Sequence, residues 1–297
     1  MEGFVPAHRS ALFRHAGVGD EPIMKDYINR MEKKDRNDLR TAVNLLENPG
    51  VSIRLINLLG YPIEAIIKVL PRWIGQAIGN TATEAVGTAF YVALSTMEKK
   101  SHSRPFRLIH QAMVLVSGTM GGFFGLPGLI VELPTSTTLM LRSIADIARS
   151  EGEDLSSVDT HLACITVFAL GGRSRGDNAA EAAYYAVRAA LTRTLSEAAE
   201  FIAQRGVVEE GTPIVIRVMA NLASRFGVIV TDKMAVEMIP ILGAIGGASI
   251  NLLFISHFQS AARGHFTVRR LERKYGEELV KKEYEKVLGE LRDRVRQ

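Results

Sequence analysis

Apolar side chains recur every three or four residues along most of the chain, which is the period of an α-helix. In the charge-rich segment 24–47, for example, Leu39, Val43 and Leu46 follow one another at spacings of four and three residues. No segment shows the alternation of apolar and polar residues that is expected of a half-buried strand. The sequence therefore predicts an all-α fold, a multi-helix bundle. Further helices are predicted at 51–59, 62–70, 73–97, 134–150, 156–170, 177–204, 213–226 and 266–297.

Two glycine-rich segments, 112–131 and 238–262, interrupt this pattern because they contain no Asp, Glu, Lys or Arg. The first is twenty residues long, about the length that crosses a hydrocarbon core of roughly 30 Å. Its five glycines and Pro127 disfavour a straight spanning helix, so a turn near 125–128 is expected. We predict two glycine-rich apolar helical hairpins or close-packed helix pairs. Glycines four residues apart, which let backbones approach closely, are Gly118 with Gly122, Gly121 with Gly125, and Gly243 with Gly247.

Composition restricts the classes of protein to which the chain can belong. Apolar residues make up 47% and charged residues 23%, which suits a soluble protein or one that associates with a membrane. The net charge is +4, and no cluster of Lys and Arg interleaved with aromatic residues predicts a nucleic-acid partner. The only cysteine, Cys164, lies in an apolar run, which favours a reducing compartment. The first residues do not resemble a secretory signal, so a cytoplasmic location is expected.

Three groups of motifs stand out along the chain. They are Gly125-Leu-Pro-Gly128 with Glu132-Leu-Pro134 and Leu141-Arg142-Ser-Ile-Ala-Asp146; Ala169-Leu-Gly-Gly172 through Val187-Arg188-Ala-Ala-Leu191; and Ile239-Pro-Ile-Leu-Gly-Ala-Ile-Gly-Gly247 through His257-Phe-Gln259, Gly264-His265-Phe266 and Arg269-Arg270-Leu271-Glu272. Together they resemble the EcsC family from about residue 45 onward. We therefore divide the chain into an N-terminal extension, 1–45, and an EcsC-like helical domain, 46–297. The resemblance implies an intracellular protein connected with a membrane, because the family is named for a gene product encoded beside the subunits of an ABC transporter. It supplies no catalytic residues.

A nucleophile is suggested by the run Gly172-Arg173-Ser174-Arg175-Gly176, which fits the G-x-S-x-G pattern of a hydrolase. Asp232 and then His257 or His265 follow in the hydrolase order. That pattern requires a strand before the serine, whereas 156–170 is predicted to be helical. The simpler interpretation is that Ser174 caps the next helix, with Asp177 completing an S-x-x-D capping pattern.

The same loop could instead bind an anion. Arg173, Ser174 and Arg175 precede a predicted helix, and a helix N-terminus offers free backbone N–H groups and a positive dipole end to a phosphate or an anionic lipid headgroup. An exposed basic turn explains the same residues. Arg188, which we include in this candidate set, shares one helix face with Asp177, Glu181 and Tyr184. The carboxylates of that face could hold a metal or act as acid and base, or form a polar stripe with no function.

Polar residues also accompany the two apolar segments. Glu132, Arg142 and Asp146 flank a hydroxyl-rich turn predicted at 134–138, and Asn251 lies within the second segment. Such groups form either a buried, paired network or a site at the membrane surface, with an ion pair expected between Arg142 and Asp146. The histidines lack the spacing of a zinc motif, so the sequence predicts neither a metal site nor a cofactor.

The primary hypothesis is a membrane-associated helical protein of the EcsC type, non-enzymatic, which modulates a membrane assembly such as an ABC transporter. It would be peripheral or partly inserted at the inner face of the plasma membrane. One alternative is a serine-dependent or metal-dependent hydrolase centred on Ser174, Asp177 and Glu181. Another is a soluble interaction module or an anionic-lipid-binding module in which the apolar segments are core helices. The oligomeric state stays open.

Overall fold

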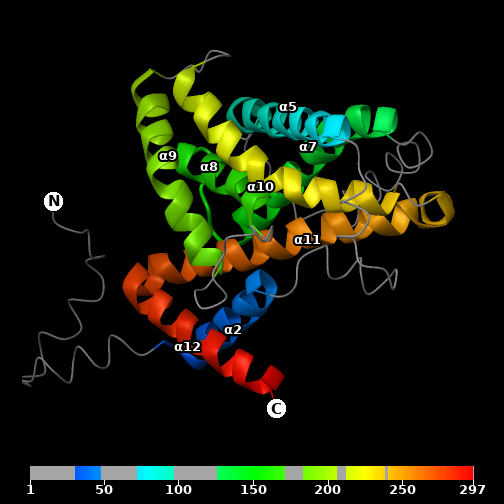
Figure 1. The fold of residues 1–297 in the computed structure, drawn as a ribbon. Coiled ribbons are helices and arrows are strands. Elements are labelled where there is room, and N and C mark those ends of the chain that lie inside the picture. The colour runs from blue at the N-terminus through cyan, green and yellow to red at the C-terminus, as the bar shows by residue number, and fades with distance from the viewer. Residues whose placement is uncertain are drawn as a thin grey trace, which may run out of the picture.

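The computed structural model describes residues 31–47, 72–96, 126–170, 183–205, 212–237 and 240–296 (Figure 1). The described residues form helices joined by short connections and contain no strand, which confirms the predicted all-α fold. The helices are α2 (Lys33–Glu47), α5 (Arg72–Thr96), α7 (Leu126–Ser150), α8 (Val158–Thr166), the 3-10 helix η1 (Val167–Ala169), α9 (Ala183–Arg205), α10 (Pro213–Glu237), α11 (Pro240–Tyr275) and α12 (Glu277–Arg296).

Four of the buried phenylalanine rings form a cluster in the described core. Phe168 comes from η1, Phe226 from α10, and Phe254 and Phe258 from α11, and all four rings are buried. The centroids of neighbouring rings are 5.1–6.2 Å apart at tilted or edge-on angles, the arrangement that aromatic pairs prefer. This cluster fixes α11 against α10 and against the end of α8.

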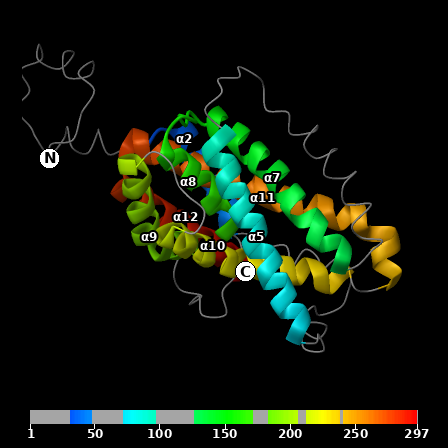
Figure 2. The same ribbon diagram turned by 90° about the horizontal axis from the view of Figure 1, so that it is seen from above.

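The long helix α11 connects two different ends of the helical body. Its 36 residues correspond to about 54 Å at 1.5 Å per residue. Figures 1 and 2 show its N-terminal end beside the end of α10, at the same end of the helical body as the beginnings of α5 and α7. Its C-terminal part packs against α2 and α12 at the opposite end. The second apolar segment therefore forms one half of a helix whose other half is charged.

Helix α7 begins earlier than predicted. A turn was expected near 125–128, but the helix starts at Leu126 and continues through Pro134 to Ser150. Pro127 lies in the first turn, where its missing N–H costs nothing because that group has no partner in the helix. The prediction of a turn was therefore wrong within the described residues 126–128.

The hydroxyl-rich run 134–138 is helical rather than a turn. Its side chains bond back to the preceding turn: the hydroxyls of Ser136 and Thr137 donate to the carbonyl of Leu133 at 3.1 and 2.6 Å, and that of Thr138 donates to the carbonyl of Pro134 at 2.9 Å. A helix accepts Ser and Thr when their hydroxyls bond to its own carbonyls in this way.

The C-terminal part of the chain contains two helices where one was predicted. Helix α11 continues through Gly243 and Gly247 and ends at Tyr275, and α12 starts at Glu277. Between them Gly276 has a φ of 89°, a left-handed conformation that is typical of the residue after a helix. Its N–H donates to the carbonyl of Glu272 at 2.8 Å. The predicted helix 266–297 is therefore broken at Gly276.

Helix α2 packs against α11, α12 and the beginning of α9. Leu39, Val43 and Leu46 are buried, so the predicted apolar stripe is confirmed. The division that we drew between residues 45 and 46 falls inside this helix. The segment before that division is thus continuous with the packing of the described domain.

Candidate functional site

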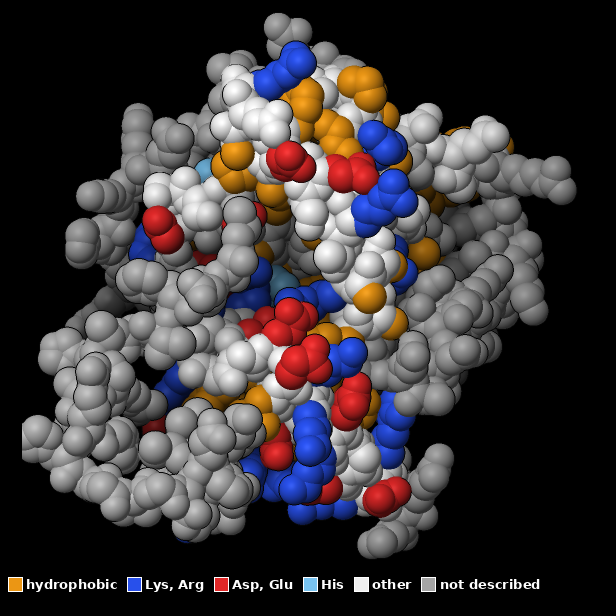
Figure 3. Space-filling model, turned by 90° about the vertical axis from the view of Figure 1, so that its left-hand side faces the viewer, with side chains coloured by type: hydrophobic (Ala, Val, Ile, Leu, Met, Phe, Trp, Pro, Cys, Tyr) orange, Lys and Arg blue, Asp and Glu red, His pale blue; other side chains and the backbone are white. Residues whose placement is uncertain are grey.

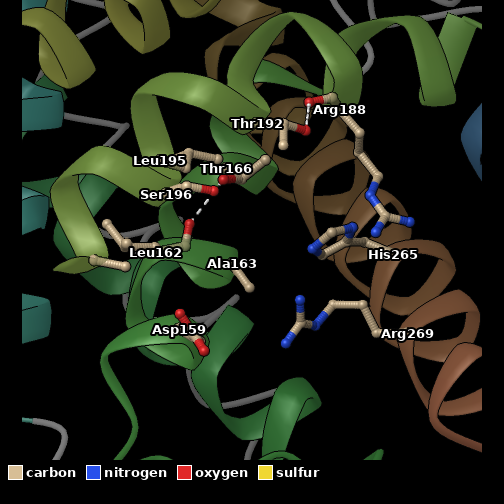
Figure 4. Close-up of a pocket in the computed structure, with 11 residues that line it drawn as sticks. Asp159, Leu162, Ala163, Thr166, Arg188, Thr192, Leu195, Ser196, His265 and Arg269 are labelled. Atoms are coloured by element: carbon tan, nitrogen blue, oxygen red, sulfur yellow. Dashed lines mark hydrogen bonds between the residues drawn. The ribbon is translucent and has the colours of Figure 1, made fainter. Parts of the chain in front are cut away.

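A cavity of about 230 Å³ lies between α8, α9 and α11 (Figure 4). Figure 3 shows a hollow on the left-hand side of the molecule, with a histidine and Lys, Arg, Asp and Glu side chains near its floor. One wall, from α8 and from α9 after Arg188, is mostly apolar and hydroxyl-bearing and includes the carboxylate of Asp159. The other, from Arg188 of α9 and from α11, carries nitrogen groups. The lining residues are Asp159, Leu162, Ala163 and Thr166 from α8, Arg188, Thr192, Leu195, Ser196 and Ala199 from α9, and His265 and Arg269 from α11.

The imidazole of His265 is held at this wall by Tyr184. The histidine is 3% exposed, and its Nδ1 lies 2.9 Å from the Tyr184 hydroxyl oxygen. That oxygen also accepts a hydrogen bond from Arg188 Nη1 at 3.3 Å. If Nδ1 donated to the tyrosine, both the hydroxyl proton and Nε2 would lack partners among these contacts, whereas a hydroxyl that donates to Nδ1 leaves only Nε2 without one. The second arrangement places the imidazole proton on Nε2. Nε2 is buried and has no hydrogen-bond partner among the described residues.

The surroundings of His265 keep its imidazole neutral. Burial lowers the pKa of His265 well below its ordinary value, and the positive charges of Arg188 and Arg269 lower it further. Burial likewise raises the pKa of the Tyr184 hydroxyl, so the tyrosine keeps its proton at neutral pH. The pair therefore presents an uncharged N–H to the cavity.

Each of the two guanidinium groups is fixed by a carboxylate. Arg188 Nη1 donates to Glu272 Oε1 at 2.6 Å, and its guanidinium lies over the Tyr184 and Tyr185 rings at 5.4 and 5.5 Å. Arg269 binds Glu153 through two bonds, Nε to Oε1 at 2.9 Å and Nη2 to Oε2 at 3.2 Å. Such paired bonds fix the direction of a guanidinium as well as its position. Figure 4 shows both groups beside the imidazole at the cavity wall.

Hydrogen bonds extend from the cavity to α2 and α12. The carboxylate of Glu47, at the end of α2, accepts from the Tyr184 backbone N–H at 3.2 Å and from the Tyr284 hydroxyl at 2.9 Å. The Tyr184 and Tyr284 rings are stacked, with centroids 5.6 Å apart. Tyr184 thus contacts both the cavity histidine and the docked N-terminal helix.

Of the predicted site residues, Arg188 lies on the cavity wall. Asn251 and His257 are buried on α11, two to four turns before His265, and do not line the cavity. Asp146 forms an ion pair with Arg149 at 3.1 Å, and Arg142 is exposed. The other predicted positions lie outside the residues whose side chains are described: Arg173, Ser174, Arg175, Asp177, Glu181, Gly118, Gly121, Gly122, Gly125 and Glu132.

Other candidate chemistry is absent from the described part of the chain. Asp232, the proposed acid of a hydrolase, is buried on α10 and does not line the cavity. Burial raises the pKa of the Cys164 thiol, which makes it a poor nucleophile. The described residues contain no group of three or more metal-ligating side chains.

Sequence reasoning did not single out Arg269, Glu153 or Glu272. A usable signal was present on α11, because residues 265, 269, 272 and 273 recur at helical spacing on one face. The partner Glu153 could not be predicted in the same way, because it lies in the connection between α7 and α8, more than a hundred residues earlier.

We expect His265 to make the protein less stable as the pH falls below about 6.5, the ordinary pKa of histidine. In that range the unfolded chain binds a proton that the folded chain does not, so the free energy of unfolding decreases with falling pH, by about 1.4 kcal/mol at pH 5.5. Urea unfolding at pH 7.5 and 5.5 should show a smaller decrease for His265→Asn than for the parent protein. An equal decrease in both would contradict the assignment of a neutral, buried His265.

The model of the EcsC protein family matches residues 63–271, which is more than two thirds of the chain. No curated protein and no solved structure matches the chain. The matched segment contains every residue that lines the cavity, whereas α2 and α12 lie outside it.

Proposed function

Because the chain belongs to the EcsC protein family, we propose that it is a non-enzymatic helical module that associates with the inner face of the plasma membrane and modulates a membrane assembly such as an ABC transporter. The observation that supports membrane association is the unequal distribution of charge between the two ends of the helical body. The charged helices α2 and α12 lie at one end, and the apolar beginnings of α7 and α11 lie at the other (Figures 1 and 2).

The two ends differ strongly in sequence. Nearly half of the residues of α2 and more than half of those of α12 are charged. By contrast, α7 begins with Leu-Pro-Gly-Leu-Ile-Val, and α11 contains no charged residue before Arg263. We call the end of the body at which α7 and α11 begin the charge-poor end. Trp73, in the first turn of α5 at this end, is 61% exposed. Tryptophan is enriched where proteins meet the membrane–water interface, so this end suits contact with lipid while α2 and α12 stay in water.

Helix α10 is not the part of the chain that we propose to contact the membrane. Its segment Pro213–Ala235 is the one described helical segment that is long and apolar enough to cross a bilayer. The helix also packs against α5, α9 and α11, as a core helix of a soluble protein does. Its Asp232 and Lys233 side chains are buried, and Lys233 Nζ lies 5.1 Å from the centroid of the Phe254 ring. We therefore propose attachment through the charge-poor end rather than a span through α10.

Trp73→Ser should weaken binding to vesicles that contain anionic phospholipid by roughly tenfold or more, the effect of withdrawing one large apolar side chain from a burying environment. The measurement is flotation of the purified full chain with vesicles. Ile216→Ser is the matched control. Ile216 is also exposed, at 51%, but it lies near the start of α10, whereas the end of α10 is the part that lies at the charge-poor end. Failure of the parent protein to float, or equal weakening by both substitutions, would overturn the proposed attachment.

The hydrolase alternative rests on Ser174, Asp177 and Glu181, which lie outside the described residues. No described contact favours it. Labelling of Ser174 by a fluorophosphonate probe in the full chain would contradict the non-enzymatic proposal.

A further inference from the structure

We infer that the cavity between α8, α9 and α11 is a binding site for a singly charged organic anion, a carboxylate or a phosphodiester that carries an apolar group. The anionic group would meet His265, Arg188 and Arg269, and the apolar group would lie against the α8 and α9 wall. This inference goes beyond the proposed membrane association and does not depend on it.

His265 has a hydrogen-bond donor that no described residue satisfies. Nε2 of this residue is buried without a partner among the described residues, and Figure 4 shows the imidazole at the cavity wall. Buried polar groups in native proteins almost always have a hydrogen-bond partner, and a buried group without one costs free energy of folding. Since the hydrogen bond from Tyr184 leaves a proton on Nε2, the missing partner is an acceptor. An acceptor in the cavity would complete the hydrogen bonding of this residue.

The two guanidinium groups at the cavity are held in place by ion pairs. Arg188 and Arg269 are held by Glu272 and Glu153, so they are positioned before any ligand arrives. A guanidinium has five N–H donors. The bonds to the carboxylates and to Tyr184 use two of the N–H groups on each arginine. The remaining donors are available to a ligand without loss of the ion pairs.

The charge balance restricts the ligand to a single negative charge. Glu272 and Glu153 neutralise the two arginines, His265 is neutral, and Asp159 is exposed at the cavity wall. Arg273, which also pairs with Glu153, offsets the charge of Asp159, so the surroundings are close to neutral and a second negative charge on the ligand would have no counter-charge. Affinity would therefore come from directed N–H donors rather than from net positive charge.

The opposite wall explains why the ligand should carry an apolar group. Leu162, Ala163, Leu195 and Ala199 line it together with Ser196, two threonines and, at its exposed edge, Asp159. The hydroxyls of Thr166 and Thr192 donate to the backbone carbonyls of Leu162 and Arg188, each at 2.7 Å, so neither proton is offered to the cavity. Binding pockets for drug-sized molecules occupy about 300–1,000 Å³. A cavity of about 230 Å³ suits a smaller amphiphile or the headgroup region of a larger one.

The test uses sodium octanoate as the probe for a soluble source of the anion and phosphatidylglycerol vesicles as the probe for a lipid source. Calorimetry of the full chain should show saturable binding of octanoate, or vesicle binding that depends on His265. Acetate should bind at least tenfold more weakly than octanoate, because it lacks the apolar group. The signal of the Nε2–H proton of His265 in nuclear magnetic resonance spectra should shift on binding.

Three variants separate the site from the general charge of the protein. His265→Asn removes the Nε2 donor and should weaken binding by roughly tenfold or more, the typical effect of losing a hydrogen bond to a charged group. Ala163→Leu should block the cavity while leaving every donor in place. Arg193→Gln, on the exposed face of α9, removes one positive charge close to the site and should leave binding unchanged.

Two results would overturn the inference. One is that neither octanoate nor phosphatidylglycerol vesicles bind in a manner that depends on His265, with the variants folded by circular dichroism. The other is that acetate binds as tightly as octanoate, which would remove the apolar part of the assignment. Octanoate binding is measured without vesicles and does not involve Trp73. If the parent protein binds octanoate but does not float with vesicles, the proposed membrane attachment fails and the cavity assignment stands.

Discussion

Replacing Gly264 with alanine is expected to loosen α2 from the body of the protein and to lower the free energy of unfolding by about 1–3 kcal/mol, the usual cost of overpacking a filled core. A Cβ atom at this position would lie 2.6 Å from Leu46 Cγ and 3.1 Å from the Ala42 carbonyl oxygen. Both atoms belong to α2. The carbonyl oxygen is part of the backbone and cannot rotate away, so the helix itself has to move.

Helix propensity opposes this effect, and the magnitudes decide the sign. Alanine is favoured over glycine in a helix interior by about 0.8–1.0 kcal/mol. Gly264→Ala is therefore destabilising only because the free-energy cost of the clash exceeds this gain. Gly289→Ala is the matched control. Gly289 is exposed on α12, and nothing lies within 4 Å of its added Cβ, so this substitution should stabilise the protein by about 0.5–1 kcal/mol.

Urea unfolding of both variants measures the difference, and limited proteolysis of segment 31–47 reports whether α2 has loosened. Leu46→Ala should cost less stability in the Gly264→Ala background than in the parent protein, because the two side chains compete for the same space. Stabilisation by Gly264→Ala comparable to that by Gly289→Ala would show that α2 does not pack on Gly264 as described.

The second large effect is expected at Glu153, whose side chain is 4% exposed and bonded to two arginines. Removing one partner of a fully buried ion pair costs about 3–5 kcal/mol. Arg269 and Arg273 are 26% and 43% exposed, so water compensates part of the loss, and Glu153→Ala should cost about 2–3 kcal/mol. Burial by itself would raise the pKa of Glu153, but the bonds from Arg269 and Arg273 outweigh it and lower that pKa.

The sign of the pH dependence follows from that direction. A carboxyl group whose folded-state pKa is lowered contributes stability above its unfolded pKa of about 4.3, and the contribution is lost as the pH falls through the folded-state pKa. The difference in stability between the parent protein and Glu153→Ala should therefore be constant near neutral pH and shrink in acid. Unfolding by urea across that range provides the measurement.

Glu197 offers the matched control. It also pairs with two arginines, Arg193 and Arg217, but these are 91% and 64% exposed. Surface ion pairs of this kind contribute about 0–1 kcal/mol, so Glu197→Ala should have little effect. If the two substitutions cost the same, the burial of Glu153 would not be the reason for its importance.

The apolar stripes of the terminal helices could be predicted from the sequence because each depends on spacing within one segment. Leu39 and Val43 on α2 and Leu271 and Tyr284 in the C-terminal part are buried as their periodicity indicates. The break at Gly276 could not be predicted, because a single glycine within a charged helical pattern costs only about 1 kcal/mol and does not by itself end a helix.

The cavity lies largely beyond what sequence patterns can predict. Arg188 was identified from its helix face, but its ion pair is with Glu272, and the neighbouring Tyr184 bonds to His265, both about eighty residues later. Neither periodicity nor motif spacing determines which distant segments converge. Prolines were misinterpreted for a related reason: Pro127 suggested a turn and Pro134 the first residue of a helix. The first occupies a helix N-terminus, and the second lies within the helix beside hydroxyls bonded to its carbonyls.

The continuity of α11 has a mechanical consequence. A helix stretches and compresses little along its axis, because every turn is closed by backbone hydrogen bonds. This one runs unbroken from the charge-poor end through His265 to Tyr275. A sliding or rolling displacement applied at its first turn is therefore delivered to the imidazole and to Arg269 with little loss. A contact that displaced the first turn of α11 along its axis would therefore also displace the residues at the cavity.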